Sequence, residues 1–302
     1  MRKIYYLFIL GILCCCTNNL KTNISESEKE RLEIVDNKIK SITKLQTFYE
    51  LDSAQPSVIK NIKEFNTAGQ IEKETKFKNN GEKENYDVFE YDVSRNEIAM
   101  TGYNEHDSLS FKRLMVYDSN SNNIELTWFF PDGTYKYKTT SIYDSKGKLS
   151  EYKYFWPDGR LKYHYTYEYS NGLKTITHGF NPDGSVGYDM YFEYNNQGNL
   201  LSETQVYPNN KINYKKTYKY NNNSVLIEET EYFSDDIVSN RNLYTYDEDG
   251  NLLTKTSLTS MGGKIKKYTY TYNKKGLLIE QYIYDSKNKP VASYNYVYAK
   301  YN

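Results

Sequence analysis

The stretch YDSKGKLSEYKYFWPDGRLKYHYTYEY, residues 143–169, decides the fold. It contains two turns. The first turn, residues 144–147, starts with Asp and ends with Gly, which suits a type I turn followed by a left-handed residue in a bulged hairpin. The middle turn, residues 156–159, carries Pro and Gly at favourable positions. Because the residues between the turns alternate with a period of two, each turn is expected to reverse a β-strand.

The same unit recurs along nearly the whole chain. Its leading aromatic residue returns every 26 residues, with one step of 25, at Phe65, Tyr91, Tyr117, Tyr143, Tyr169, Tyr194, Tyr220, Tyr246, Tyr272 and Tyr298. A fixed period of this length is typical of repeat architectures. One further step back reaches residue 39, so we expect residues 38–49 to form an opening strand rather than a helix.

The sequence therefore predicts an all-β protein. We expect about ten hairpin repeats over residues 38–302, in an elongated antiparallel β-meander whose long sheet twists and spirals. The alternative is a parallel β-helix with one coil per 26 residues. Two reversing turns in each period favour the hairpins.

Composition limits the class of function. Tyrosine is extreme, at 35 of 302 residues, and charged residues make up 26% of the chain with 39 basic against 39 acidic. A nucleic-acid-binding protein would normally show a basic stripe, so we expect no nucleic-acid partner. The mean hydropathy of −0.84 is low for a protein with one deep core. Disorder is disfavoured because Tyr and Thr, both strand formers, are abundant.

The N-terminal segment has the layout of an export signal. Arg2 and Lys3 precede an apolar run over residues 4–13, and three consecutive cysteines follow. Residues 13–16 resemble a bacterial lipoprotein box, with Cys16 as the expected acylated residue and Cys14 or Cys15 as alternatives. All three cysteines lie here, so the body can hold no disulfide framework.

The segment after the cysteines is polar. We interpret residues 1–16 as a lipoprotein signal peptide, residues 17–37 as a polar tether and residues 38–302 as the repeat domain. Within the tether, Ser25 and Glu28 form a capping-box pattern that predicts a short helix over residues 25–35.

Catalytic signals are weak. The histidines are His106, His164 and His178, and no nucleophile elbow, metal-spaced histidine pair or phosphate loop occurs. His164 is expected on the strand face opposite the tyrosines. Residues 247–250 resemble part of a calcium loop but lack its remaining oxygen ligands, so a plain turn is favoured. We predict no enzymatic activity, no catalytic residue, no metal and no cofactor.

The segments at residues 143–149 and 246–252 resemble the YD repeat of the Rhs family, and the middle Pro-Asp-Gly belongs to the same pattern. The resemblance covers roughly residues 39–302 and is closest to small bacterial lipoproteins made of such repeats alone. It implies a β-strip that spirals into a shell, and a role as an envelope interaction protein. The repeats are also similar to the MORN-variant units of some immunity-type proteins.

The tyrosine ladder is the feature suited to binding, because Tyr combines an apolar ring with a polar tip. Holding the sheet together is the competing role for these rings. The predicted function is a lipid-anchored, non-catalytic scaffold of the cell envelope that binds a protein or a glycan. The alternative is an immunity-like protein that neutralises a toxin by direct contact. We expect an outer-membrane lipoprotein, facing the periplasm or the surface, with a possible binding face formed by Tyr163, Tyr165, Tyr167, Tyr268 and Tyr270.

Overall fold

The computed structural model describes residues 25–50, 53–233 and 237–302 as one helix and one antiparallel sheet. The helix is α1 (Glu26–Asp36). The strands are β1 (Ile39–Glu50), β2 (Ser53–Ala54), β3 (Val58–Phe65), β4 (Ile71–Phe77), β5 (Lys83–Tyr91), β6 (Glu97–Asn104), β7 (Leu109–Tyr117), β8 (Asn123–Phe129), β9 (Tyr135–Tyr143), β10 (Leu149–Phe155), β11 (Leu161–Ser170), β12 (Leu173–Phe180), β13 (Val186–Tyr194), β14 (Leu200–Val206), β15 (Ile212–Tyr220), β16 (Leu226–Tyr232), β17 (Val238–Tyr246), β18 (Leu252–Thr259), β19 (Lys264–Tyr272), β20 (Leu278–Tyr284) and β21 (Pro290–Lys300).

Consecutive strands pair as antiparallel hairpins, and the opening strand at residues 39–50 is present. The turns have the expected chemistry. At the first turn of the β9–β10 hairpin, the Gly147 amide bonds the Asp144 carbonyl at 2.9 Å, and Gly147 has φ +74°. The register shifts by one residue beside these turns, for example between Leu149 and Glu151. Such bulges bend the strand and increase its twist.

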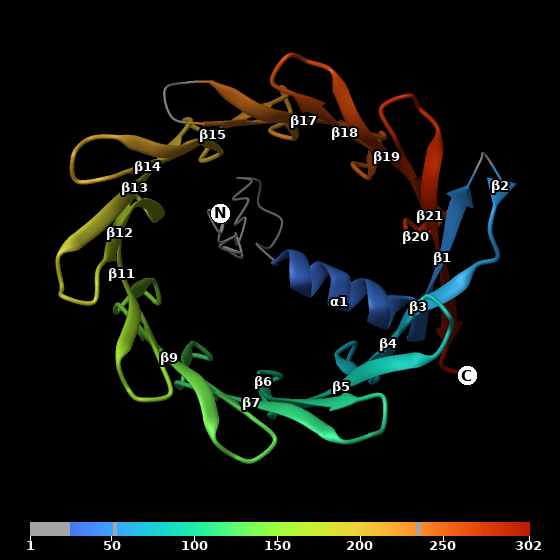
Figure 1. Ribbon diagram of the computed structural model, residues 1–302, viewed down its shortest axis with the longest axis horizontal. Coiled ribbons are helices and arrows are strands. Elements are labelled where there is room, and N and C mark those ends of the chain that lie inside the picture. Colours follow the sequence, from blue (N-terminus) through green and yellow to red (C-terminus); the bar gives the residue numbers. More distant parts are fainter. Residues whose placement is uncertain (1–24, 51–52, 234–236) are drawn as a thin grey trace.

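The sheet closes into a barrel, so the prediction of an elongated, spiralling meander is wrong, and so is the parallel β-helix. β1 pairs with β3 on one side and with β21 on the other, from Ile39 opposite Lys300 to Phe48 opposite Ala292. All strands except β2, which pairs only with β1, form a 20-stranded antiparallel wall. Figure 1 shows this ring down its axis. Twist and bulges bring the two ends together, and closure removes both unpaired edges.

A hydrogen bond from the leading tyrosine links neighbouring first turns. The hydroxyl donates to the backbone carbonyl 20 residues earlier in the chain, at distances of 2.6–3.1 Å. The donor–acceptor pairs are Tyr91–Ile71, Tyr117–Glu97, Tyr143–Asn123, Tyr169–Leu149, Tyr194–Lys174, Tyr220–Leu200, Tyr272–Leu252 and Tyr298–Leu278. Burial raises the pKa of Tyr91 to about 12, so the phenol stays protonated and able to donate.

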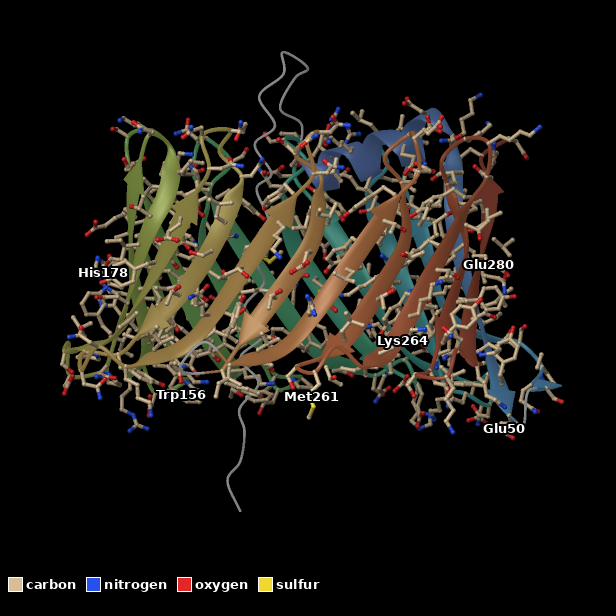
Figure 2. All side chains as sticks on the ribbon, turned by 90° about the horizontal axis from the view of Figure 1, so that it is seen from above. Glu50, Trp156, His178, Met261, Lys264 and Glu280 are labelled. Carbon is tan, nitrogen blue, oxygen red and sulfur yellow. The ribbon has the colours of Figure 1, made fainter. Side chains whose placement is uncertain are left out.

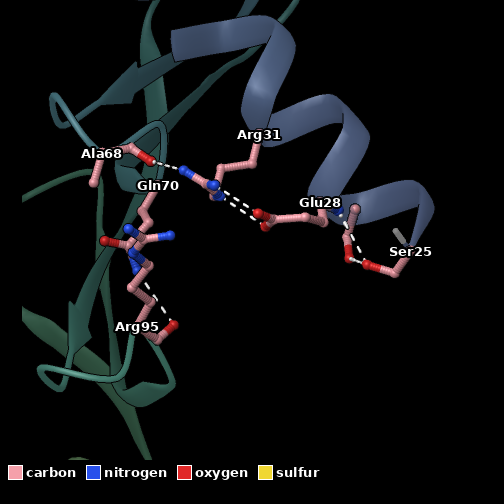
Figure 3. A network of polar contacts seen from close by, with 7 residues as sticks. Ser25, Glu28, Arg31, Ala68, Gln70 and Arg95 are labelled. Atoms are coloured by element: carbon pink, nitrogen blue, oxygen red, sulfur yellow. Dashed lines mark hydrogen bonds and ion pairs between the residues drawn. The ribbon is translucent and has the colours of Figure 1, made fainter. Parts of the chain in front are cut away.

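The capping box at Ser25 produces the predicted helix. The Ser25 hydroxyl accepts a hydrogen bond from the Glu28 amide at 3.1 Å, as an N-cap should. Arg31 then donates to the Ala68 carbonyl at 2.6 Å and pairs with Glu28, which attaches α1 to the turn between β3 and β4 (Figure 3). Gly69 permits this close approach, because a Cβ there would lie 2.7 Å from the Arg31 carbonyl oxygen.

α1 lies across the seam where the barrel closes. Its buried Ile34 packs with Ile39 of β1, Phe65 of β3 and Leu277 of the turn between β19 and β20. These partners lie on both sides of the β1–β21 junction. Ile39 and Phe65 occupy the leading tyrosine position of the first two units. At these two positions apolar side chains therefore replace the hydroxyl and pack in a buried apolar cluster.

The side view in Figure 2 shows α1 at one end of the barrel, where the first turns lie, and Trp156 and Met261 of the middle turns at the other end. Among the described residues, no helix is long and apolar enough to cross a bilayer. The signal peptide, Cys16 and residues 17–24 of the tether lie outside the described residues. Residues 26–36 of the tether form α1.

Removing one hydroxyl of the ladder tests its contribution. Tyr169→Phe is expected to lower the free energy of unfolding by about 1 kcal/mol, because the bond to the Leu149 carbonyl is lost while the ring stays. Urea denaturation measures the change. Tyr103→Phe on another strand is the control, since that hydroxyl makes no such backbone bond, and it should leave the midpoint in place. Equal effects of the two substitutions would contradict a special role for the ladder.

Candidate functional site

The register assigns every wall residue to an inward or an outward face. Opposed residues of an antiparallel pair share a face. Tyr298 lies opposite Ile42, and both pack on the cluster beneath α1, which lies inside the ring (Figure 1). Following the register around the barrel places the alternating tyrosines of β11 and β19 on this inward face. For example, Tyr163 lies opposite Tyr154, and Tyr270 opposite Gln281.

The five tyrosines singled out from the sequence all lie on the inward face but not together. Tyr163, Tyr165 and Tyr167 belong to β11, and Tyr268 and Tyr270 belong to β19, on the other side of the ring (Figure 1). Each of their side chains is only partly buried. Burial raises the pKa of Tyr165, Tyr167 and Tyr270, so these hydroxyls are neutral donors.

The β11 tyrosines form part of a larger array, which we call the aromatic belt. It runs along the inward face from β7 to β13 with ring centroids 4.6–6.4 Å apart. Its closest pairs are Phe111–Trp128 at 4.6 Å and the stacked pair Tyr137–Tyr154 at 4.8 Å. The belt consists of Phe111, Trp128, Tyr137, Tyr152, Tyr154, Tyr163, Tyr165 and Tyr188.

Two strand glycines make room for the belt at its ends. A Cβ at Gly102 would overlap the Phe111 ring, and one at Gly179 would lie 2.7 Å from the Tyr188 ring. Both glycines lie directly opposite the aromatic residue that covers them. Each ring therefore lies flat over a neighbouring strand instead of standing away from the wall.

Lysines lie over the rings at the end of the belt nearest the middle turns. Lys162 places its ammonium 4.0 Å from the Trp156 centroid and 4.9 Å from that of Tyr154. Lys136, 26 residues earlier, lies 5.5 Å from the Trp128 centroid. Such contacts are cation–π interactions. The belt thus offers apolar ring surface, phenol hydroxyls and cationic groups side by side.

The next sector of the inward face, β14 to β18, is polar. Glu203 accepts hydrogen bonds from Tyr214 at 3.2 Å and Tyr218 at 2.8 Å. Glu229 contacts Lys216 and the Tyr244 hydroxyl. Burial opposes the ionisation of Glu229, but these two partners outweigh it and lower its pKa. The carboxylates of this sector are held as hydrogen-bond acceptors among tyrosines.

The strand histidines lie on the outward face, as the sequence predicts for His164. Its Nε2 lies 2.7 Å from a Glu151 oxygen, and its ring stacks on Phe180. His178 lies between two carboxylates, with Nδ1 2.7 Å from Asp189 and Nε2 2.9 Å from Glu168. The contact with Glu168 contributes most to raising the pKa of His178; burial opposes this rise and Asp189 supports it.

The acidic turn at residues 247–250 is a structural turn. The Asp247 carboxylate accepts hydrogen bonds from the Asn251 backbone amide at 2.7 Å and from its side-chain amide at 2.9 Å. Within the described ranges, no group of three or more His, Cys, Asp or Glu side chains is arranged to hold a metal ion.

The His178 pairing predicts a pH-dependent stability. Because its folded pKa lies above the ordinary 6.5, the stabilisation is complete below pH 6.5 and is lost as pH rises through the folded value. His178→Gln should therefore lower the free energy of unfolding at pH 6, by up to about 1 kcal/mol for a surface pair, and much less at pH 9. Urea denaturation at both pH values measures this. His106→Gln, in an exposed turn, is the control; a loss that does not depend on pH would refute the assignment.

No family model matches the sequence, and no curated protein is similar to it. Among solved structures, a Photorhabdus luminescens Tc holotoxin pore matches over 79% of this chain with 13% identity and a TM-score of 0.39. This chain spans only 13% of that chain's length.

Two other structures match over more of their length. A porin-like protein from Bacteroides uniformis has 12% identity and a TM-score of 0.38, covering 86% of this chain and 98% of its own. A putative outer membrane lipoprotein-sorting domain from Vibrio parahaemolyticus has 9% identity and a TM-score of 0.19, covering 90% of this chain and 93% of its own.

Proposed function

We propose that the protein is a lipid-anchored barrel of the cell envelope that binds a glycan chain at the aromatic belt without catalysing a reaction. The observation that supports this is the belt itself, a continuous array of partly buried rings on the inward face of β7 to β13. Rings needed only to fill a core would be fully buried. A barrel with this many strands is wider than side chains can fill, so the inward face is accessible to a partner.

The chemistry of the belt favours a carbohydrate over a protein. Peptides commonly bind by adding a strand to a free sheet edge, but the wall strands β1 and β3 to β21 are each paired on both sides. The belt instead offers aromatic faces, phenol hydroxyls and lysines. A sugar ring has C–H faces that pack on aromatic rings and hydroxyls that bond to tyrosine and lysine.

The envelope location rests on the sequence of the N-terminus. A basic start, a short apolar run and Cys16 fit an exported protein whose acylated cysteine holds it at a membrane. A short polar segment then leads to α1, which is attached to the turn between β3 and β4.

Two stacked tyrosine pairs with the same ring separation provide a matched test of binding. Tyr137 and Tyr154 stack at 4.8 Å on the inward belt, and Tyr86 and Tyr103 stack at 4.8 Å on the outward face. An array of bacterial envelope glycans, probed with the purified protein, should show a ligand. The double substitution Tyr137→Ala and Tyr154→Ala should weaken it about tenfold or more, since each aromatic contact contributes about 0.5–1.5 kcal/mol.

The outward pair serves as the control, and Tyr86→Ala with Tyr103→Ala should leave glycan binding unchanged. Equal losses from both double variants would mean that the belt is not the binding surface. An array without any signal, together with specific capture of an envelope protein that depends on the belt pair, would replace the glycan by a protein partner.

The anchor is tested separately. Cys16→Ser is expected to abolish incorporation of radiolabelled palmitate and to shift the protein from the membrane fraction to the soluble fraction of the expressing bacteria. Cys14→Ser and Cys15→Ser are the matched controls and should keep both properties. Retained labelling in the Cys16 variant would move the acylation site to a neighbouring cysteine or remove it altogether.

A further inference from the structure

Exposed apolar side chains gather at the end of the barrel opposite α1. The largest exposed fractions there are 96% for Met261 and 61% for Phe233 and Ile237. Figure 2 shows Met261 and Trp156 at this end. All of them lie in or beside middle turns between β8 and β19. We call this set the apolar rim; it consists of Phe130, Trp156, Tyr207, Phe233, Ile237 and Met261.

The turns themselves do not need these aromatic residues. Phe130, Trp156, Tyr207 and Phe233 occupy one repeat position, the first residue of the middle turn. In several other units this position holds a residue whose side chain caps the turn. Asn104, for example, accepts hydrogen bonds from the His106 and Ser108 amides at 2.9 and 3.0 Å, and Asp285 does the same for its turn. In the aromatic units the third turn residue bonds the last turn amide instead, as Asp132 does for Thr134 and Asp158 for Arg160. The turn therefore does not need the aromatic side chain, and another property accounts for its presence.

The opposite end and the outward wall differ from the apolar rim. The first turns are built from Asp, Asn, Ser and Gly, and within the described chain Val93 is their one exposed large apolar residue. The wall carries charged pairs along its strands, such as Lys153 with Glu151 and Lys219 with Glu228. Charged side chains on a lipid-facing wall are strongly unfavourable. Only the apolar rim therefore has a composition suited to lipid.

We propose that the apolar rim docks onto a phospholipid bilayer and inserts its aromatic tips into the interfacial region. Trp, Tyr and Phe favour this region because it is apolar on one side and wet on the other. Arg160 and Lys162 adjoin Trp156, and their long side chains can reach lipid phosphates. The nearby Asp158 repels lipid phosphates only weakly, because its carboxylate accepts hydrogen bonds from the backbone and the side chain of Arg160.

The length of the N-terminal segment permits this orientation. α1 begins near the middle of the ring (Figure 1). Cys16 and Ser25 are nine residue steps apart and can span at most about 31 Å when extended, and a nine-residue strand is about 30 Å long before its tilt is considered. An acylated Cys16 can therefore reach the plane of the apolar rim. Only this argument about orientation rests on the lipid anchor of the proposed function. The argument from the chemistry of the apolar rim is independent of that anchor.

Vesicle binding tests the proposal without the anchor. The chain beginning at residue 16, with Cys16→Ser, is mixed with vesicles of phosphatidylethanolamine and phosphatidylglycerol at three to one and sedimented. Substituting Phe130, Trp156, Phe233 and Met261 by Ser should lower the bound fraction at least tenfold. The control replaces Val116, Ile142 and Val297 by Ser, which are 50–54% exposed on the outward wall, and should bind as the parent does.

A fluorescence measurement locates the contact. Trp128→Phe leaves Trp156 as the sole tryptophan. Its emission should shift to the blue on vesicle addition and be quenched by lipids brominated near the headgroup. Absence of vesicle binding, or an equal loss in the wall control, would overturn the proposal. A dimer in lipid-free buffer that the rim variant abolishes would do so too, because the rim would then join two copies of the chain. None of these outcomes involves a glycan, so the proposed function is judged independently.

Discussion

Pairing between β1 and β21 is the constraint on which the rest of the structure depends. This pairing closes the repetitive sheet into a barrel. The tyrosine face becomes the inward face and the opposite face of the sheet becomes the outward face. The two seam strands are the longest of the wall, at 12 and 11 residues. Their long ladder, the cluster around Ile34 and the bond from the Tyr301 hydroxyl to the Phe65 carbonyl all stabilise the same junction.

The hydroxyl ladder explains why the leading residue is tyrosine rather than any aromatic. A phenylalanine would supply the same ring, yet it could not reach the carbonyl of the neighbouring first turn. The exceptions support this reading. Phe65 and Ile39 lack the hydroxyl, and they lie where α1 covers the wall and a polar group would be buried beneath Ile34. The sequence predicted that the tyrosine rings hold the sheet together but did not reveal this hydrogen bond. The bond depends on which backbone carbonyl lies beside the hydroxyl once the strands have paired.

The local structure could be predicted from the sequence, but closure could not. The turn at residues 144–147 and the alternation after it specify a hairpin, and the 26-residue period repeats that information in each unit. In a periodic sequence each unit pairs with the next in the same way, whether the sheet is open or closed. The period therefore does not predict whether the first and last strands pair with each other. The alternation likewise placed Tyr163, Tyr165 and Tyr167 on one face. It could not show that this face is concave, or that Phe111 and Trp128 extend it into a belt.

In a repeat protein of this kind, functional residues are expected at positions where the units differ, because the residues that all units share stabilise the fold. Apart from the shortened turn at residues 170–172, first turns keep Asp or Asn at their opening position, where the side chain bonds the turn amides. In the middle turns, the side chains of Asn104 and Asp285 at the first position bond turn amides in the same way. Four other middle turns have an aromatic residue at this position, namely Phe130, Trp156, Tyr207 and Phe233. The repeat therefore tolerates either solution, because the third turn residue, such as Asp132, bonds the turn amide in the aromatic units. Of the five successive middle turns from Phe130 to Phe233, four carry the aromatic residue and one carries Asn181, so the departures gather on one part of the barrel end. Selection for contact with a partner accounts for that arrangement, and selection for stability alone does not.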